Sequence, residues 1–182
     1  MAQVDDSTIL ELFGNETTRN TALGHLIAKY QQRLYWHIRK IVIDHDDSDD
    51  VLQNTFIKVW KGLENFKAES QLYTWLYRIA TNEALNLLRQ KKSKPTTSIH
   101  SIEYELSRNL ESDNYFTGDE IQLRLQQAIL TLPEKQRLVF NMRYYDEMPY
   151  EQMSQILETS VGALKASYHI AAKKIEELLI NT

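Results

Sequence analysis

Apolar residues recur every three or four positions along most of this 182-residue chain. One series steps through Leu23, Ile27, Tyr30 and Leu34, and similar series run through residues 51–63 and 72–88. No stretch alternates apolar and polar residues over the length of a strand. A spacing of three to four residues places the apolar side chains on one face of an α-helix. The sequence therefore predicts an all-α fold of amphipathic helices.

Residues 94–120 interrupt this pattern. They contain Pro95, Gly118 and many serine, threonine and asparagine residues, and their apolar residues are scattered. Such composition is typical of a loop. Helical spacing resumes at Ile121. The sequence predicts two small helical domains, at residues 15–93 and 121–180, joined by a flexible acidic linker over 94–120.

The net charge of −4 at pH 7 argues at first against nucleic-acid binding, because nucleic-acid-binding domains are usually basic. The linker carries two basic and six acidic side chains, which account for the whole net charge. The blocks on either side of it are balanced. Within the first block, an acidic run over 44–50 is offset by a basic helix end over 78–92, so opposite charges are expected on different surfaces.

Several classes of site are excluded. The chain has no cysteine, which removes disulfides, thiolate zinc sites and thiol nucleophiles. Its five glycines form no GxGxxG or GxxxxGK phosphate cradle, and its five histidines form no HExxH motif or nucleophile elbow. The N-terminus lacks a signal-peptide pattern, and no apolar run is long enough for a membrane span. We expect a soluble intracellular protein without catalytic residues, metal or cofactor.

The acidic run Asp44–Asp50 allows more than one interpretation. A calcium loop needs glycine at its sixth position and glutamate at its twelfth, but these positions hold Asp49 and Thr55. Carboxylates at a helix N-terminus complement the helix dipole, and Asp47 or Ser48 can cap the helix. The cap is the favoured interpretation. A metal site and a protein-binding role for two of the carboxylates remain open.

The segment over 66–94 combines aromatic residues with an increasingly basic end. Tyr73, Trp75 and Tyr77 are too close together to share one helix face, so at least one of them should be accessible. Aromatic rings beside cations suit single-stranded nucleic acid, because bases stack on the rings while the cations meet phosphates. The alternative is that the aromatic rings belong to the core and that the basic end is only a solvated helix terminus.

Residues 150–180 have the pattern of a helix-turn-helix: a short helix, an interruption over 158–160, and a longer helix. In such units the N-terminal part of the second helix enters the major groove. Ser160 is the predicted N-cap of that helix. The small residues Gly162 and Ala163 allow a close approach to DNA. A plain helical hairpin is the alternative interpretation.

Two separated blocks of this chain resemble the bacterial extracytoplasmic-function (ECF) sigma factors. SDDVLQNTFIKVWKGLENFK, followed by SQLYTWLYRIATNEALNLLRQKK, resembles the sigma-2 domain of that family. LPEKQRLVFNMRYYDEMPYEQMSQILETSVGALKASYHIAAKKI resembles its sigma-4 domain. The resemblance implies a dissociable sigma subunit of RNA polymerase, which directs promoter recognition and DNA strand opening without a chemical step of its own.

The resemblance assigns residues to three surfaces, and it places Phe56 and Trp60 in the core. The surface for the clamp helices of the largest polymerase subunit is Asp50, Gln53 and Asn54. The surface for the −10 element is Lys67, Ser70, Tyr73, Thr74, Tyr77, Arg78 and Asn82, with Arg89, Lys91 and Lys92 on backbone phosphates.

The surface for the −35 element is Ser160, Gly162, Ala163, Lys165, Ala166, His169 and Lys173. The −35 surface departs from the family pattern. The family often has glycine at the position of Glu158, and arginine at the positions of Ser167, Ile170 and Ala172.

The resemblance also implies partners and a location. The partners are core RNA polymerase, through its clamp helices and its flap, promoter DNA, and an anti-sigma factor. The expected location is the bacterial cytoplasm, without membrane insertion. Two other classes remain open: a helix-turn-helix regulator that acts without core polymerase, and a helical metalloenzyme that uses the carboxylates of residues 44–50.

Overall fold

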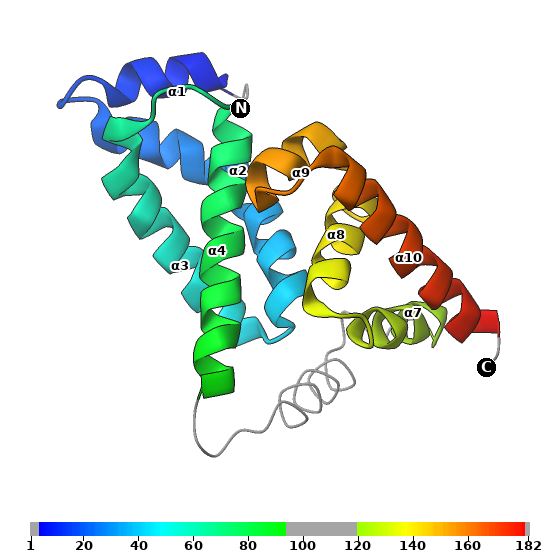
Figure 1. Cartoon of the computed structure of the whole chain (residues 1–182). Helices are drawn as coiled ribbons and strands as arrows, with labels where there is room; N and C mark the ends of the chain where they lie inside the picture. The colour runs from blue at the N-terminus through cyan, green and yellow to red at the C-terminus, as the bar shows by residue number, and fades with distance from the viewer. Residues whose placement is uncertain (1–3, 94–119, 181–182) are drawn as a thin grey trace.

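The computed structural model describes residues 4–93 and 120–180, and within these ranges it contains helices and no strand (Figure 1). The all-α fold is confirmed. None of the helices in these ranges is both long and apolar enough to cross a membrane. In chain order the elements are α1 (Asp6–Phe13), α2 (Arg19–Val42), α3 (His45–Gly62), the 3₁₀ turn η1 (Leu63–Asn65), α4 (Leu72–Ser93), α7 (Glu120–Leu130), α8 (Glu134–Tyr144), α9 (Tyr150–Leu157) and α10 (Val161–Ile180).

Helices α2, α3 and α4 pack side by side, and α1 packs against α2. The predicted apolar stripes face inward at Tyr30 and Leu34 of α2 and at Leu76 and Ala84 of α4, which are buried. At the start of α2 the prediction is wrong, because Leu26 is fully buried whereas Leu23 and Ile27 are only half-buried. Burying a leucine side chain completely stabilises a fold by about 1.5–3 kcal/mol. The stripes of these helices therefore form one core that positions α3 and α4.

The acidic run caps α3, but not at the predicted residue. Asp44 is the N-cap, and its carboxylate accepts a hydrogen bond of 2.9 Å from the backbone N–H of Asp47. The expectation of a cap at Asp47 or Ser48 is wrong. The preceding Ile43 has a left-handed φ of 64°, which ends α2 and lets α3 start at once after Asp44. Ser48 is instead fully buried, and its hydroxyl donates to the carbonyl oxygen of Asp44.

Helix α8 is buried on more than one face. Phe140 packs with Ile129 of α7 and Ile175 of α10 in a small core of the C-terminal half. Val139 and Met142 instead belong to the large core that also contains the stripes of α2 and α4. Helix α8 therefore packs into two cores at once.

The two helical halves are in contact through α9, which lies against α4, and through α8, which lies near α2 (Figure 1). The apolar cluster continues from one half into the other through Met153 and Ile156 of α9. The division into domains at 15–93 and 121–180 stays a prediction, because all of the predicted linker except Glu120 lies outside the described residues.

Helices α9 and α10 form the helix-turn-helix. Glu158 ends α9 in the left-handed conformation, with φ 51° and ψ 41°. The hydroxyl of Ser160 then accepts a hydrogen bond of 3.3 Å from the backbone N–H of Ala163, and α10 begins at Val161. The N-cap predicted at Ser160 is confirmed.

Candidate nucleic-acid and polymerase interfaces

Helix α3 presents an exposed polar face. Val51, Thr55 and Val59 point into the core, and Asp50, Gln53 and Asn54 are exposed on the opposite side. Ile57 lies one turn beyond Gln53 and Asn54 and is 52% exposed. Positions 50, 53, 54 and 57 share one face because they are separated by three or four residues. The predicted polymerase surface is thus continuous and includes an apolar residue.

Sequence reasoning missed Ile57 because its apolar character suggested nothing unusual within an amphipathic helix. Its distance of seven residues from Asp50 was the available signal. Phe56 and Trp60, predicted to belong to the core, are partly buried and pack against it. The Trp60 ring meets Phe13 edge to face, with centroids 5.5 Å apart.

The acidic run holds no group of three or more residues arranged as metal ligands within the described part of the chain. Asp44 caps α3, and Asp47 forms an ion pair with Lys91 of α4. On the exposed side, Nε2 of His45 lies 3.7 Å from a carboxylate oxygen of Asp49. These contacts account for the run as a helix terminus.

The loop between η1 and α4 carries two predicted −10 residues. Lys67 is exposed and Ser70 is half-buried. Between them Ala68 has a φ of 55°, a left-handed conformation that L side chains rarely adopt. Phe66 anchors the start of the loop by packing on Trp75 of α4, with the two ring centroids 5.2 Å apart. Trp75 also fills the space beside Gly62, so it is a packing residue.

The aromatic residues at the start of α4 are only partly accessible. Tyr73 is half-buried and Tyr77 is buried, and their ring centroids are 4.3 Å apart. Burial raises the pKa of both phenols, so both stay neutral at physiological pH. Thr74 is buried as well, and its hydroxyl has no hydrogen-bond partner in the described structure. The assignment of these residues to the −10 element remains a prediction.

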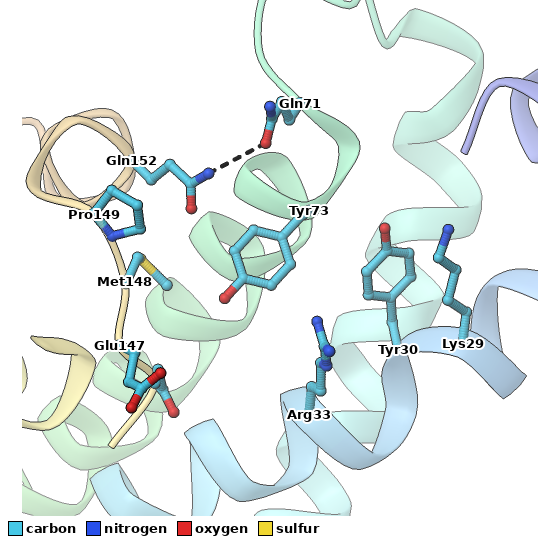
Figure 2. A pocket seen from close by; sticks show the side chains of 10 residues that line it. Lys29, Tyr30, Arg33, Gln71, Tyr73, Glu147, Met148, Pro149 and Gln152 are labelled. Atoms are coloured by element: carbon cyan, nitrogen blue, oxygen red, sulfur yellow. Dashed lines mark hydrogen bonds between the residues drawn. The ribbon is translucent and has the colours of Figure 1, made fainter. Parts of the chain in front are cut away.

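Arg33 was missed by sequence reasoning. It lies exposed on α2 and lines a pocket of about 320 Å³ together with Tyr73. Figure 2 shows the two side chains facing this pocket, with Glu147, Met148 and Pro149 of the C-terminal half on its other side. No local pattern marks Arg33, because only the packing of α2 against α4 places it beside the tyrosine.

The basic end of α4 is mostly paired with acids. Lys91 contacts Asp47 of α3, and Lys92 donates to Glu134 of α8 over 2.9 Å. Arg89 is exposed and donates to the side-chain oxygen of Asn86 over 3.1 Å. Phosphate contacts by the two lysines would therefore replace existing ion pairs.

The predicted −35 residues form a single exposed face on α10. All of them are exposed: Ser160, Gly162, Ala163, Lys165, Ala166, His169 and Lys173. The buried face of α10 consists of Leu164, Ala171 and Ile175. The ammonium group of Lys165 lies 5.7 Å from the ring centre of Tyr150, which positions it at the start of the helix.

The two predicted DNA surfaces meet in one cavity of about 420 Å³ between the halves. Asn82 and Arg89 of α4 line it from one side, and Ala163 and Ser167 of α10 line it from the other. Leu138 and Ile156 contribute apolar surface. A second cavity, of about 580 Å³, brings Lys67, Ser70 and Arg78 opposite Gln155 and Glu158 of the C-terminal half.

Comparison with known proteins identifies both halves of the chain. Residues 26–94 match the family model described as Sigma-70 region 2, and residues 122–175 match that of Sigma-70 region 4. The chain is 31% identical to the ECF RNA polymerase sigma-E factor of Escherichia coli over 85% of each chain. It is 29% identical to the RNA polymerase sigma-H factor of Pseudomonas aeruginosa, over 98% of this chain and 96% of that protein.

Two solved structures share the fold. One is CnrH in complex with the cytosolic domain of CnrY, with a TM-score of 0.69 and 24% identity over 97% of each chain. The other is the sigma factor RpoE of Bartonella quintana in complex with the anti-sigma factor NepR, with a TM-score of 0.65 and 19% identity over 86% of this chain and 95% of that one. From the matched regions, their order and the identity to sigma-E, this chain belongs to the ECF RNA polymerase sigma factors.

Proposed function

We propose that this chain binds core RNA polymerase through α3, captures one strand of the −10 element with α4 and the loop before it, and reads the −35 element with α10. The observation that carries this proposal is that the residues assigned to the first and third surfaces each form a continuous exposed face. The buried stripes of α3 and α10 lie on the opposite sides of these helices.

The polymerase surface combines a charge, two amides and an apolar residue. Asp50, Gln53 and Asn54 surround one side of the exposed Ile57. An apolar residue within a polar rim is the usual composition of a protein interface. The contact with the clamp helices of the largest subunit is therefore expected to centre on Ile57.

Strand opening would proceed by capture of an unpaired base. Taking a base out of the duplex costs a few kcal/mol, and stacking on an aromatic ring returns about 1–3 kcal/mol. Tyr73 is the accessible ring, and Arg33 supplies positive charge in the pocket that the ring lines. The chain itself breaks no covalent bond in this process, and we assign it no catalytic residue, metal or cofactor.

Recognition of the −35 element rests on a helix poor in arginine. The exposed cationic side chains of α10 are Lys165, Lys173 and Lys174, and His169 is exposed on the same helix. Each bidentate arginine contact to guanine is worth about 1–3 kcal/mol of discrimination, and this helix makes none. Tethering to polymerase raises the effective concentration of the helix at its site and offsets the loss.

Two further features of the proposal concern partners and location. Both structural neighbours were solved in complex with another chain, one of them named an anti-sigma factor. We propose an anti-sigma partner for this chain too. Partnership with polymerase and promoter DNA places it in the bacterial cytoplasm.

Co-purification tests the polymerase contact. The chain should elute with core polymerase in low salt, and a variant with both Asp50→Ala and Gln53→Ala should elute mostly free while keeping its helical circular dichroism. A chain that by itself binds duplex DNA tightly and specifically, and that never binds polymerase, would instead be a helix-turn-helix regulator.

A further inference from the structure

Asp146 joins the two halves of the molecule. It lies just after α8, and its carboxylate contacts two residues of α2: one oxygen is 3.1 Å from Nδ1 of His37, and the other bonds the ammonium group of Lys40. The imidazole in turn lies 2.8 Å from the hydroxyl of Thr81 on α4. The side chain of His37 is 1% exposed and that of Asp146 is 10% exposed. One carboxylate thus links the C-terminal half to both α2 and α4.

Asp146 remains charged in this position. Burial acts to raise the pKa of its carboxyl group, but the hydrogen bond and charge of His37 and the ammonium group of Lys40 hold that pKa below its usual value. Removing one partner of a buried ion pair strongly destabilises the folded state, because the other charge stays buried without a partner. Replacing Asp146 alone should therefore weaken the contact between the halves.

Helix α9 of the C-terminal half lies against α4, beside a stripe that starts at Gln71, just before α4, and continues through Thr74, Arg78, Asn82 and Arg89. These positions follow one another at spacings of three, four or seven residues, so they share one helix face. Thr74 is buried and Arg78 is half-buried, whereas the other three are exposed. The side-chain amide of Gln152 on α9 donates to that of Gln71 over 3.2 Å, as Figure 2 shows. Four of the five stripe residues, all except Gln71, are predicted to contact the −10 element.

Two polar atoms of this stripe lack hydrogen-bond partners in the described structure. The hydroxyl of Thr74 and the Nε of Arg78 are buried, and neither has a hydrogen-bond partner in the described structure. Buried polar atoms are normally satisfied, and leaving one unsatisfied is costly. In the closed arrangement these two polar atoms therefore lack hydrogen bonds, which DNA or water would provide once the halves separate.

The closed arrangement is also incompatible with a promoter in geometric terms. Elements centred at −10 and −35 lie about 25 base pairs apart, which is roughly 85 Å along B-DNA. Here residues assigned to the two elements, Asn82 and Ala163, line one cavity. The two surfaces cannot reach both elements without separating.

We infer that Asp146, with His37 and Lys40, is a latch that holds the free chain closed and restricts access to Thr74 and Arg78 of the −10 face until the halves separate. This inference rests on the proposed function for the identity of that face. The latch itself is a property of the chain alone. It predicts that weakening the Asp146 contact raises DNA binding by the free chain and changes little once polymerase has opened the halves.

The first test compares Asp146→Asn with Asp6→Asn. Asp6 is a matched control, because its carboxylate also binds a lysine and a second partner, Lys29 and Tyr30, but joins α1 to α2 within one half. The probe is a fluorescent single-stranded oligonucleotide carrying the −10 sequence of a promoter that the holoenzyme transcribes. Asp146→Asn should bind it about tenfold more tightly than the wild type, because apparent affinity scales with the open fraction. Asp6→Asn should match the wild type. Equal affinity of the wild type and Asp146→Asn would overturn the latch.

The second test locks the halves together. The chain contains no native cysteine, so Gln71→Cys with Gln152→Cys gives one thiol on each half for a short, reducible bismaleimide linker. The linked chain should lose transcription with core polymerase, and reduction of the linker should restore it. A linked chain that transcribes as well as the reduced one would refute the latch but leave the proposed function standing.

A third measurement separates the latch from the function altogether. Spin labels at Lys61→Cys and Glu176→Cys, both exposed, report the distance between α3 and α10. Asp146→Asn should broaden this distance and shift it upward, and an unchanged distribution would refute the latch. If even the unmodified chain fails to transcribe with polymerase, the proposed function is wrong, and this distance still decides whether the latch exists.

Discussion

The ammonium group of Lys91 is bonded to the carboxylate of Asp47, which ties the basic end of α4 to the first turn of α3. The sequence predicted opposite charges on separate surfaces, one for a protein and one for DNA. The structure brings them together at this pair. A phosphate would therefore have to compete with Asp47 for Lys91.

Asp47→Asn should remove the competition of Asp47 for Lys91, so that Lys91 contacts a DNA phosphate more readily. Each additional phosphate contact with single-stranded DNA steepens the slope of log K against log salt by about 0.7. The variant should show this steeper slope with a −10 oligonucleotide in salt titrations, and Lys91→Ala in the same background should remove the gain. A slope identical to that of the wild type would show that Lys91 does not reach phosphate.

Replacing Glu158 by glycine should stabilise the fold. Glu158 holds a left-handed φ of 51° at the end of α9, and such a conformation costs a residue with a side chain about 1–2 kcal/mol. After the larger chain entropy of glycine is subtracted, urea denaturation should show a gain of about 0.5–1 kcal/mol in the free energy of unfolding.

The matched control is Glu151→Gly. Glu151 is exposed in the first turn of the same helix, where glycine should destabilise by about 1 kcal/mol. Loss of stability in both variants would mean that the side chain of Glu158 contributes more than its backbone conformation costs.

Ile57→Ala should weaken polymerase binding without weakening the fold. The side chain is 52% exposed, so its truncation leaves no buried cavity, but at the centre of an interface it should lower polymerase affinity about tenfold, or about 1.4 kcal/mol. Fluorescence anisotropy with labelled chain and core polymerase measures this. Ile121→Ala, at an exposed isoleucine of α7, should bind as the wild type does.

Acid should remove the contribution of Asp146 to stability. Its pKa in the folded chain is below the usual value of 3.8, so the stabilisation is present above that value and is lost as the pH falls through the folded pKa. At pH 7, Asp146→Asn should lower the free energy of unfolding by up to about 3 kcal/mol.

The difference in the free energy of unfolding between wild type and Asp146→Asn should shrink as the pH falls below about 4. Urea titrations of both proteins at several pH values test this. A difference that persists unchanged at pH 3 would mean that packing, rather than charge, is responsible.

The helices themselves could be predicted because their determinants are local. The buried Tyr30 and Leu34 of α2 and the cap at Ser160 follow from residues within one or two turns. The cap of α3 was misplaced because the sequence offers several carboxylates in a row. The left-handed Ile43, which decides where α3 begins, has no sequence signal of its own.

The packing of the two halves could not be predicted in the same way. His37 and Asp146 are 109 positions apart, and no periodicity relates them. Residues 137–142 of α8 are all buried, but Arg137 and Asn141 among them are polar, so the sequence of α8 does not indicate that the helix packs on more than one side.

Promoter-dependent transcription tests most directly whether this chain directs transcription as a sigma subunit. Purified chain and core polymerase should together start RNA at discrete sites on genomic DNA of the host, and sequencing of the 5′ ends should show a shared pair of elements upstream. Core polymerase alone should start none of these transcripts. An identical set of 5′ ends with and without the chain would contradict the account.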